Sequence, residues 1–261
     1  MTPAERISAA IRQAPGGTAI VAFVTAGFPS REHFREHLAQ VGNEADVVEI
    51  GVPFTDPMAD GMTIQRSSRE ALRQGFTLRW LLDELGAMAR DGQLPGAPLL
   101  LMSYLNPLLA FGLGNLAARA AGAGVCGFIV PDLPFDESDD LRAALAPHGL
   151  ALIQMVTPVT TPERRARLCA ATQGFVYAVT MTGVTGRNAA VPAEVTGYLD
   201  AVRGAAKLPV CAGFGIRSRA QVEQLRAHVA GVIVGSALVE VMENGQDAAQ
   251  FLRSLRPAGV T

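Results

Sequence analysis

The sequence of 261 residues has only three cysteines, no block of charge of one sign and no long uninterrupted apolar run. Its 22 basic and 24 acidic residues are mixed, for a net charge of −2, so the charge pattern indicates no nucleic-acid or membrane partner. The longest apolar region, 98–113, is broken by Asn106 and Pro107, which argues against a bilayer span. Without metal-ligand spacing of cysteines or an apolar signal core, we expect reduced thiols and a cytoplasmic location.

Lysine and histidine are also scarce. Lys207 is the only lysine, and it precedes the predicted strand Pro209–Ala212, whereas catalytic groups in parallel barrels follow the strands. A Schiff-base aldolase, which needs an active-site lysine, is therefore excluded. Of the four histidines, His148 and His228 also precede predicted strands. His33 and His37 are expected on the exposed face of an outer helix. We expect no metal site, and a chemistry carried by carboxylates.

Short β-rich segments alternate with helical patterns along the whole chain. The predicted strands are Ala19–Thr25, Val47–Gly51, Leu99–Ser103, Gly127–Val130, Leu150–Val156, Gly174–Val179, Pro209–Ala212 and Gly231–Val234. Most are nearly continuous apolar runs, as parallel strands covered on both faces are. Eight β-then-α units in about 250 residues predict an α/β fold, a single (β/α)8 TIM barrel over residues 1–261. An open doubly wound sheet is the alternative, but no Gly-x-Gly-x-x-Gly turn follows the first strand.

Polar residues mark the expected starts of five helices. Thr161 is followed by Pro162 at the first helical position, and Ser218 with Gln221 has the pattern of a capping box. The five expected N-caps are Ser30, Thr77, Ser138, Thr161 and Ser218.

The segment Val47–Gly61 is the most informative part of the chain. It places Glu49 inside a short apolar strand, with Asp56 and Asp60 in the following loop, which is long for a βα connection. Burial of a carboxylate among Val and Ile is costly, because desolvation penalises the charged form. A structural acid with a hidden partner is the alternative, but such groups often serve proton chemistry. Asp56 precedes a proline and has either a turn-forming or a catalytic role.

Unusual loops follow the later strands. After Tyr177, the segment 180–192 is small, hydroxylated and rich in glycine, which indicates a mobile lid or an ordinary flexible loop. The last two strands end in Gly213-Phe214-Gly215 and Gly235-Ser236. Backbone N–H groups of glycine turns and helix N-termini bind anions, and TIM barrels often hold phosphate after strands seven and eight. We therefore predict a phosphate site there.

At these residues the chain resembles the α subunit of tryptophan synthase, over nearly its whole length. The matching motifs are Glu-x-Gly-Val-Pro-Phe-x-Asp-Pro-x-Ala-Asp-Gly at Glu49–Gly61, then Thr63–Gln65, Gly183–Gly186, Gly213–Gly215 and Gly235–Ala237. The resemblance implies a carbon–carbon lyase of tryptophan biosynthesis that cleaves indole-3-glycerol phosphate to indole and glyceraldehyde 3-phosphate by a retro-aldol reaction.

The resemblance also implies a role for each site residue. Glu49 is the principal acid/base and protonates C3 of the indole ring, whereas Asp60 accepts a hydrogen bond from the indole N–H. Tyr177 lines the site, and Phe23 and Leu101 belong to the indole pocket, with barrel core an equally good interpretation of these two. The remaining expected residues hold the phosphate or close the loop after strand six: Gly186, Gly213, Phe214, Gly215, Gly235 and Ser236 for phosphate, and Thr185 with Asp132 for closure.

The family implies a partner, a pyridoxal-phosphate β subunit that receives indole through a channel, usually in an α2β2 complex. Asp56, Asn106 and Pro107 are expected near that interface. No cofactor is expected in this chain, since it offers no suitable lysine. Met62, in place of a common proline, and Met181 depart from the family pattern near moving loops. The alternatives are a free-standing lyase, a catalytically silent barrel that binds a partner, and a phosphosugar isomerase.

Overall fold

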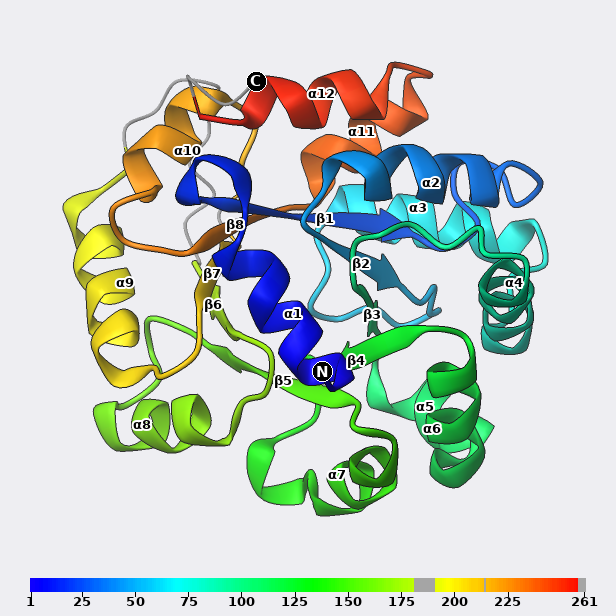
Figure 1. Ribbon diagram of the computed structural model, residues 1–261, viewed down its shortest axis with the longest axis horizontal. Coiled ribbons are helices and arrows are strands. Elements are labelled where there is room, and N and C mark those ends of the chain that lie inside the picture. Colours follow the sequence, from blue (N-terminus) through cyan, green and yellow to red (C-terminus); the bar gives the residue numbers. More distant parts are fainter. Residues whose placement is uncertain (181–190, 214, 258–261) are drawn as a thin grey trace.

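The computed structural model describes residues 1–180, 191–213 and 215–257 of the chain. Its parallel strands pair in sequence order from β1 to β8, and β8 returns to pair with β1, so the sheet is a closed barrel (Figure 1). The strands are β1 Ala19–Thr25, β2 Val47–Gly51, β3 Leu99–Met102, β4 Val125–Ile129, β5 Ala151–Val156, β6 Val176–Val179, β7 Val210–Gly213 and β8 Gly231–Val234. The predicted TIM barrel is confirmed, and the open sheet is wrong.

Helices surround the barrel and follow the strands (Figure 1). They are α1 Pro3–Arg12, α2 Phe34–Glu44, α3 Met62–Arg73, α4 Leu78–Arg90, α5 Leu105–Phe111, α6 Leu113–Gly122, α7 Asp139–Leu145, α8 Pro162–Ala171, α9 Ala193–Ala205, α10 Arg219–Leu225, α11 Ser236–Glu243 and α12 Ala248–Leu255. Short 3-10 turns lie at Pro15–Gly17, Phe135–Glu137 and Ala146–His148. No helix of the described ranges is long and apolar enough to cross a membrane.

Three of the predicted helix caps are confirmed. Thr77 and Thr161 accept hydrogen bonds from backbone N–H groups in their helices, and Ser218 forms the capping box with Gln221. The prediction for Ser30 is wrong, because a turn intervenes and α2 begins only after His33. Ser138 does occupy an N-cap position, but its hydroxyl donates to the Phe135 carbonyl instead of capping α7.

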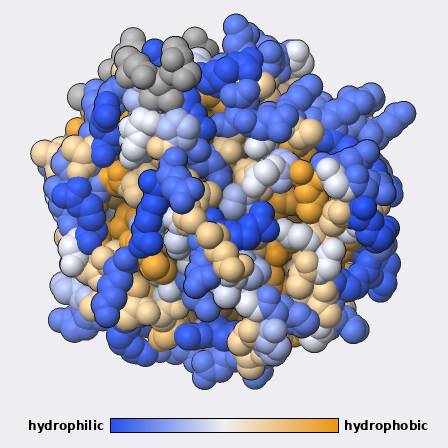
Figure 2. Space-filling model, viewed as in Figure 1, coloured by the Kyte–Doolittle hydropathy of each residue, from blue (hydrophilic) through white to orange (hydrophobic). Residues whose placement is uncertain are grey.

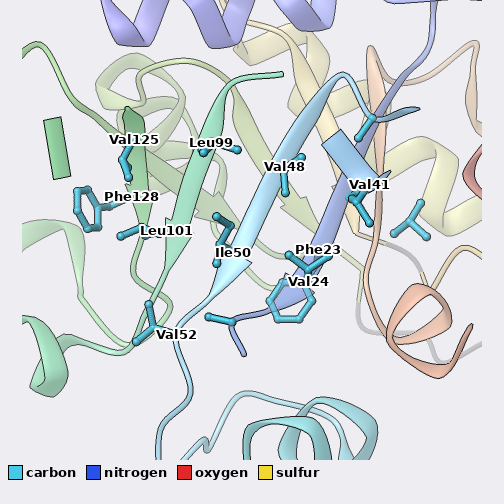
Figure 3. Close-up of a cluster of buried hydrophobic side chains, with 14 of the residues drawn as sticks. Phe23, Val24, Val41, Val48, Ile50, Val52, Leu99, Leu101, Val125 and Phe128 are labelled. Carbon is cyan, nitrogen blue, oxygen red and sulfur yellow. The ribbon is translucent and has the colours of Figure 1, made fainter. Parts of the chain in front are cut away.

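Side chains of each strand alternate between the barrel interior and the layer beneath the helices. Figure 3 shows part of the outer layer, in which Val48 and Ile50 of β2 lie beside Leu99 and Leu101 of β3. The intervening residues face inward, and Val47 and Leu100 belong to a separate buried cluster. Glu49 pairs in register with Leu100 and so shares this inward direction.

Helix α1 covers the amino-terminal end of the barrel. Ile7 and Ile11 are fully buried or nearly so and pack with the inward-facing residues at the starts of the strands. The Ser8 hydroxyl donates to the Gly174 carbonyl just before β6. Figure 1 shows α1 lying across the middle of the barrel, and Figure 2 shows the same face with hydrophilic side chains around its rim. This end is therefore filled, which leaves the carboxyl end for a site.

The single lysine and the four histidines lie where the sequence predicted, with one correction. Lys207, His148 and His228 precede β7, β5 and β8, away from the carboxyl ends of the strands. His33 is exposed, but His37 is half-buried, and its Nδ1 has no hydrogen-bond partner among the described residues. The expectation of a fully exposed polar face was wrong for His37, because it sits beside the buried contact of α2 with α12.

The three cysteines are buried and unpaired, as their surroundings in the sequence predicted; they are Cys126, Cys169 and Cys211.

Candidate active site

A cavity of about 490 Å³ opens at the carboxyl ends of the strands. Residues far apart in the sequence meet there because every parallel strand of a closed barrel ends at the same rim. Eight of the predicted site residues line it: Phe23, Glu49, Asp60, Tyr177, Gly213, Gly215, Gly235 and Ser236. Thr185, Gly186 and Phe214 lie outside the described residues.

Glu49 lies on the wall of this cavity with only 1% of its surface exposed. Neither carboxyl oxygen has a hydrogen-bond partner within the described part of the chain. Burial, and then the negative charge of Asp60, raises the pKa of Glu49 to about 8. A carboxylic acid that is neutral at pH 7 can donate a proton, which suits this group to general acid chemistry.

Asp60 lies in the loop after β2 and keeps a lower pKa than Glu49. Burial raises its pKa to about 6, and a hydrogen bond with Tyr104 acts in the opposite direction. Its backbone is held on both sides, since its N–H donates to the Pro57 carbonyl and its carbonyl accepts from Gln65 Nε2 at 2.9 Å. At pH 7 the cavity therefore presents one protonated and one ionised carboxyl group, a pair whose environments assign them different tasks.

Tyr104 is a site residue that the sequence reasoning missed. Its hydroxyl accepts a hydrogen bond from the Ala59 N–H at 2.8 Å and donates one to the Asp60 side chain. Tyr104 therefore holds the loop after β2 in place. Burial, followed by the negative charge of Asp60, raises the pKa of Tyr104 to about 12. The sequence could have identified Tyr104 by its position just after β3, because barrel enzymes have their functional groups at that rim.

Tyr177 on β6 lies between the acid and the glycine turn after β7. Burial and the nearby Glu49 raise its pKa well above the ordinary value, so its hydroxyl stays protonated. A Cβ built on Gly213 would approach the Tyr177 ring at 3.0 Å and its hydroxyl at 3.1 Å. The absence of a side chain at Gly213 thus gives this tyrosine its room.

Two hydrophobic predictions have opposite outcomes. Phe23 lines the cavity, and its ring lies over Gly51, where an added Cβ would come within 2.4 Å of the ring. Leu101 is fully buried in the outer layer and does not line the cavity, so the pocket interpretation is corrected to barrel core. Met102 takes its place, because a shift of one residue along a strand reverses the direction of the side chain.

The opposite wall of the cavity consists of glycine turns. Gly215 has a φ of 66°, and Gly235 is the N-cap of α11, whose first residue is Ser236. The first N–H groups of a helix have no intrahelical acceptor, so this end is suited to binding an anion. Arg217 points elsewhere, because its guanidinium pairs with Glu240 at 2.6 Å. Glu240 also accepts from Thr63 at 3.1 Å and so joins α3 to α11 beside the cavity.

The remaining predicted residues lie near the rim but outside the cavity. Asp132 accepts a hydrogen bond from the Leu105 N–H at 2.9 Å, at the start of α5, and its expected loop partner is outside the described residues. Asp56 is exposed and accepts from its neighbour Thr55, as a turn residue does. Asn106 is exposed and Pro107 half-exposed in the first turn of α5. The described residues contain no cluster of His, Cys, Asp or Glu that could hold a metal ion.

Comparison with known proteins identifies the family. The family model of the tryptophan synthase alpha chain matches residues 10–257. Tryptophan synthase alpha chains from Nitratidesulfovibrio vulgaris and Solidesulfovibrio magneticus are 44% and 46% identical, cover 96% and 93% of this chain, and are themselves covered over 98% and 94%.

Solved structures agree with the sequence relatives. Tryptophan synthase from M. tuberculosis has a TM-score of 0.85 and 33% identity, with 99% of this chain and 98% of that chain covered. The alpha subunit from Legionella pneumophila has a TM-score of 0.84 and 29% identity, with 98% and 97% covered. With a matching family model over nearly its whole length and relatives above 40% identity, the chain belongs to the tryptophan synthase alpha chain family.

Proposed function

We propose that Glu49 is the acid and base with which this lyase of tryptophan biosynthesis cleaves indole-3-glycerol phosphate into indole and glyceraldehyde 3-phosphate. The observation that carries the proposal is one buried carboxyl group, with its pKa raised to about 8, in the same cavity as Asp60 and the glycine turns. No histidine of the described residues lines that cavity, and neither does Lys207, so carboxyl groups are its titratable acids and bases of ordinary strength.

The reaction follows from these protonation states. The Glu49 acid protonates C3 of the indole ring, which turns the ring into a leaving group. The bond from C3 to the glycerol chain breaks as the adjacent hydroxyl loses its proton, and the electron pair of the broken bond returns to the indole ring. The resulting Glu49 carboxylate takes up that hydroxyl proton, so the aldehyde forms and the acid is regenerated.

Asp60 and the glycine turns act on the two ends of the substrate. Ionised Asp60 accepts the indole N–H hydrogen bond and stabilises the positive charge that develops on the ring. The first amides of α11, with Gly215 and Gly235, hold the phosphate. In this proposal Tyr177 and Phe23 shape the cavity between the two ends of the substrate. Thr185 and Asp132 act together to close the loop after β6 over the substrate.

The family works with a beta subunit, and we infer an α2β2 complex in which indole passes to the pyridoxal phosphate of that partner. Three large apolar side chains support a partner surface near Asp56 and Asn106, because they are exposed: Met58 by 85%, Met62 by 82% and Leu109 by 52%. A free-standing lyase is the alternative, and strong stimulation of turnover by a beta subunit would decide against it.

Two broader proposals accompany this function. Pairing of β1 with β8 joins the first strand to the last, which supports one domain over residues 1–261. Three buried, unpaired thiols suit a reducing compartment, and we propose the cytoplasm.

The decisive experiment is a Glu49→Gln substitution assayed for release of indole from indole-3-glycerol phosphate. We expect turnover to fall by about 10²–10⁴-fold because the amide cannot donate or accept the proton, while the substrate still binds. Glu36→Gln, an exposed position on α2, is the matched control and should keep parent turnover. Near-parent turnover of Glu49→Gln would assign the proton transfer to another residue.

A further inference from the structure

A second cavity, of about 320 Å³, lies where β4 and β5 separate. Their pairing ends at Ile129 and Ile153, beyond which the loop 130–135 turns away towards α7. The cavity is lined by this loop, by residues 152–155 of β5 and by α8, which Figure 1 shows beside β5. Pro131 and Met155 line both this cavity and the catalytic one, so the two share a wall.

Gln154 is an unexpected residue for this wall. Its neighbours on the helix-facing side of β5, Leu152 and Val156, are apolar and belong to the outer core. Gln154 is only 7% exposed, and its side-chain amide forms no hydrogen bond with any residue in the described ranges. This amide is not one of the fully enclosed polar atoms without a partner, so it reaches the open space of the cavity. Since the residue lines the cavity, a bound molecule would supply the missing partner.

Two arginines of α8 lie beside the cavity and form ion pairs there. Arg164 and Arg167 both pair with Asp136, at 2.9 Å and 2.7 Å, so two guanidinium groups share one carboxylate. Only Arg164 of the two lines the cavity. The other charged residue of the lining is Asp132, which accepts from the Leu105 N–H at the start of α5. Arg164 has five N–H donors and uses one of them on Asp136, so donors remain for a ligand.

We propose that this cavity binds a small organic carboxylate with an apolar body. The carboxylate accepts hydrogen bonds from the Arg164 guanidinium and the Gln154 amide, a charge-assisted arrangement. The body packs against Phe135, Leu152 and Leu168, which line the rest of the cavity. The volume lies at the lower end of the range for ligand pockets, which limits the ligand to a small molecule. Such a ligand would lie against the wall that this cavity shares with the catalytic one, formed by Pro131 and Met155, without entering the catalytic cavity.

The first test compares three probes of one shape and different charge on the full chain. Phenylacetate, phenylacetamide and phenethylamine are titrated by calorimetry or by ligand-observed NMR. We expect phenylacetate to bind at least about tenfold more tightly than the amine, because a carboxylate accepts hydrogen bonds from the free donors of Arg164, whereas an ammonium group has no acceptor and carries the same charge as Arg164. Equal affinity for all three, or no binding of phenylacetate, would overturn the proposal.

A matched pair of variants locates the site. Arg164→Gln and Arg167→Gln remove the same charge from the same ion-pair network, but only Arg164 lines the cavity. We expect the first to weaken phenylacetate binding about tenfold or more and the second to change it less than about threefold. Equal losses in both variants would indicate general electrostatic attraction and refute the site.

Gln154→Leu separates this cavity from the catalytic one. We expect loss of phenylacetate binding with unchanged indole release, and a retained fold because leucine matches the apolar outer layer. Retained phenylacetate binding in Gln154→Leu would place the probe elsewhere, in the catalytic cavity or on the surface, and end the proposal. The arginine pair remains a test if this variant folds poorly.

Discussion

Two carboxyl groups in one cavity hold different charges because their surroundings differ. Glu49 is fully enclosed and lacks a hydrogen-bond donor among the described residues, so the neutral form is favoured. Asp60 is less enclosed, and Tyr104 bonds to its charged form. Their pKa values of about 8 and about 6 bracket neutral pH, so indole release should have a bell-shaped pH dependence whose limbs belong to the coupled pair.

The raised pKa of Glu49 should also appear in the stability of the protein. Its pKa is about 8 in the folded chain against an ordinary 4.5, so between these values the folded state binds more protons and loses stability as the pH rises. Glu49→Gln lacks this titration. Its free energy of unfolding, relative to the parent, should therefore increase by about 2–3 kcal/mol between pH 5.5 and 7.5. Urea unfolding at both pH values measures this, and a constant difference would contradict the assigned burial.

Tyr104→Phe tests the residue that sets the charge of Asp60. Loss of the hydroxyl removes a bond that lowers the pKa of Asp60, so this pKa should rise further above its ordinary value. The acid limb of the rate profile should move up by about half to one pH unit, with a larger loss of turnover at pH 6 than at pH 8. Tyr198→Phe is the control, since its hydroxyl donates to the Val156 carbonyl outside the cavity. Equal losses at both pH values would leave Tyr104 with a structural role only.

At the scale of elements, the strands set the direction of each side chain and the turns set the approach of the backbone. The glycine turn before α11 is the clearest example. A Cβ on Gly235 would lie 3.8 Å from Phe23 Cβ, which is an ordinary van der Waals contact. The position tolerates alanine sterically, but a larger side chain would press on Phe23 and cover the amides of α11.

A graded pair of substitutions at Gly235 should therefore separate packing from phosphate binding. We expect Gly235→Ala to change KM for indole-3-glycerol phosphate only mildly, and Gly235→Val to raise KM about tenfold or more with a smaller effect on kcat. Steady-state kinetics of indole release gives KM and kcat for each variant and is the measurement that checks this. An unchanged KM in Gly235→Val would argue against phosphate binding at the start of α11.

At the scale of the molecule, the two ends of the barrel have different tasks. Helix α1 fills the amino end with Ile7 and Ile11, so the cavity opens at one end only. The exposed methionines Met58 and Met62 lie on the loop and helix that follow β2, beside the cavity. Apolar groups left exposed around a cavity mouth are typical of a surface that another subunit covers.

Met58→Asp tests that surface. Because Met58 is 85% exposed, the substitution should change the free energy of unfolding by less than about 0.5 kcal/mol. Affinity for a tryptophan synthase beta subunit should nevertheless fall about tenfold or more, because a charge would be desolvated at the interface. Gln246→Asp, exposed after α11, is the control and should bind as the parent does. Calorimetric titration with the beta subunit decides, and unchanged affinity would move the interface elsewhere.

Local patterns in the sequence were enough for the barrel and most strand boundaries, and they singled out the two carboxyl groups that we propose as the catalytic pair. Apolar runs and helical periods depend on neighbouring residues, and Glu49 stands out because its strand is otherwise apolar. The starts of β4 and β6 shifted by two residues, since Val125 already pairs with Leu99 and Gly174 adopts a φ of 76° in a turn before β6. The family resemblance added the roles of residues but left Leu101 open between the indole pocket and the barrel core, and the structure places it in the core.

Only the tertiary structure decided which charges and contacts those residues experience. The charge of Asp60 depends on Tyr104, which is 44 residues further along the chain, and the room for Tyr177 depends on Gly213. The place of Gln154 in a cavity became visible only when the loop after β4 and helix α8 were in place around it. A sequence specifies the type and direction of each side chain, whereas burial and electrostatics arise from segments that the closed barrel brings together.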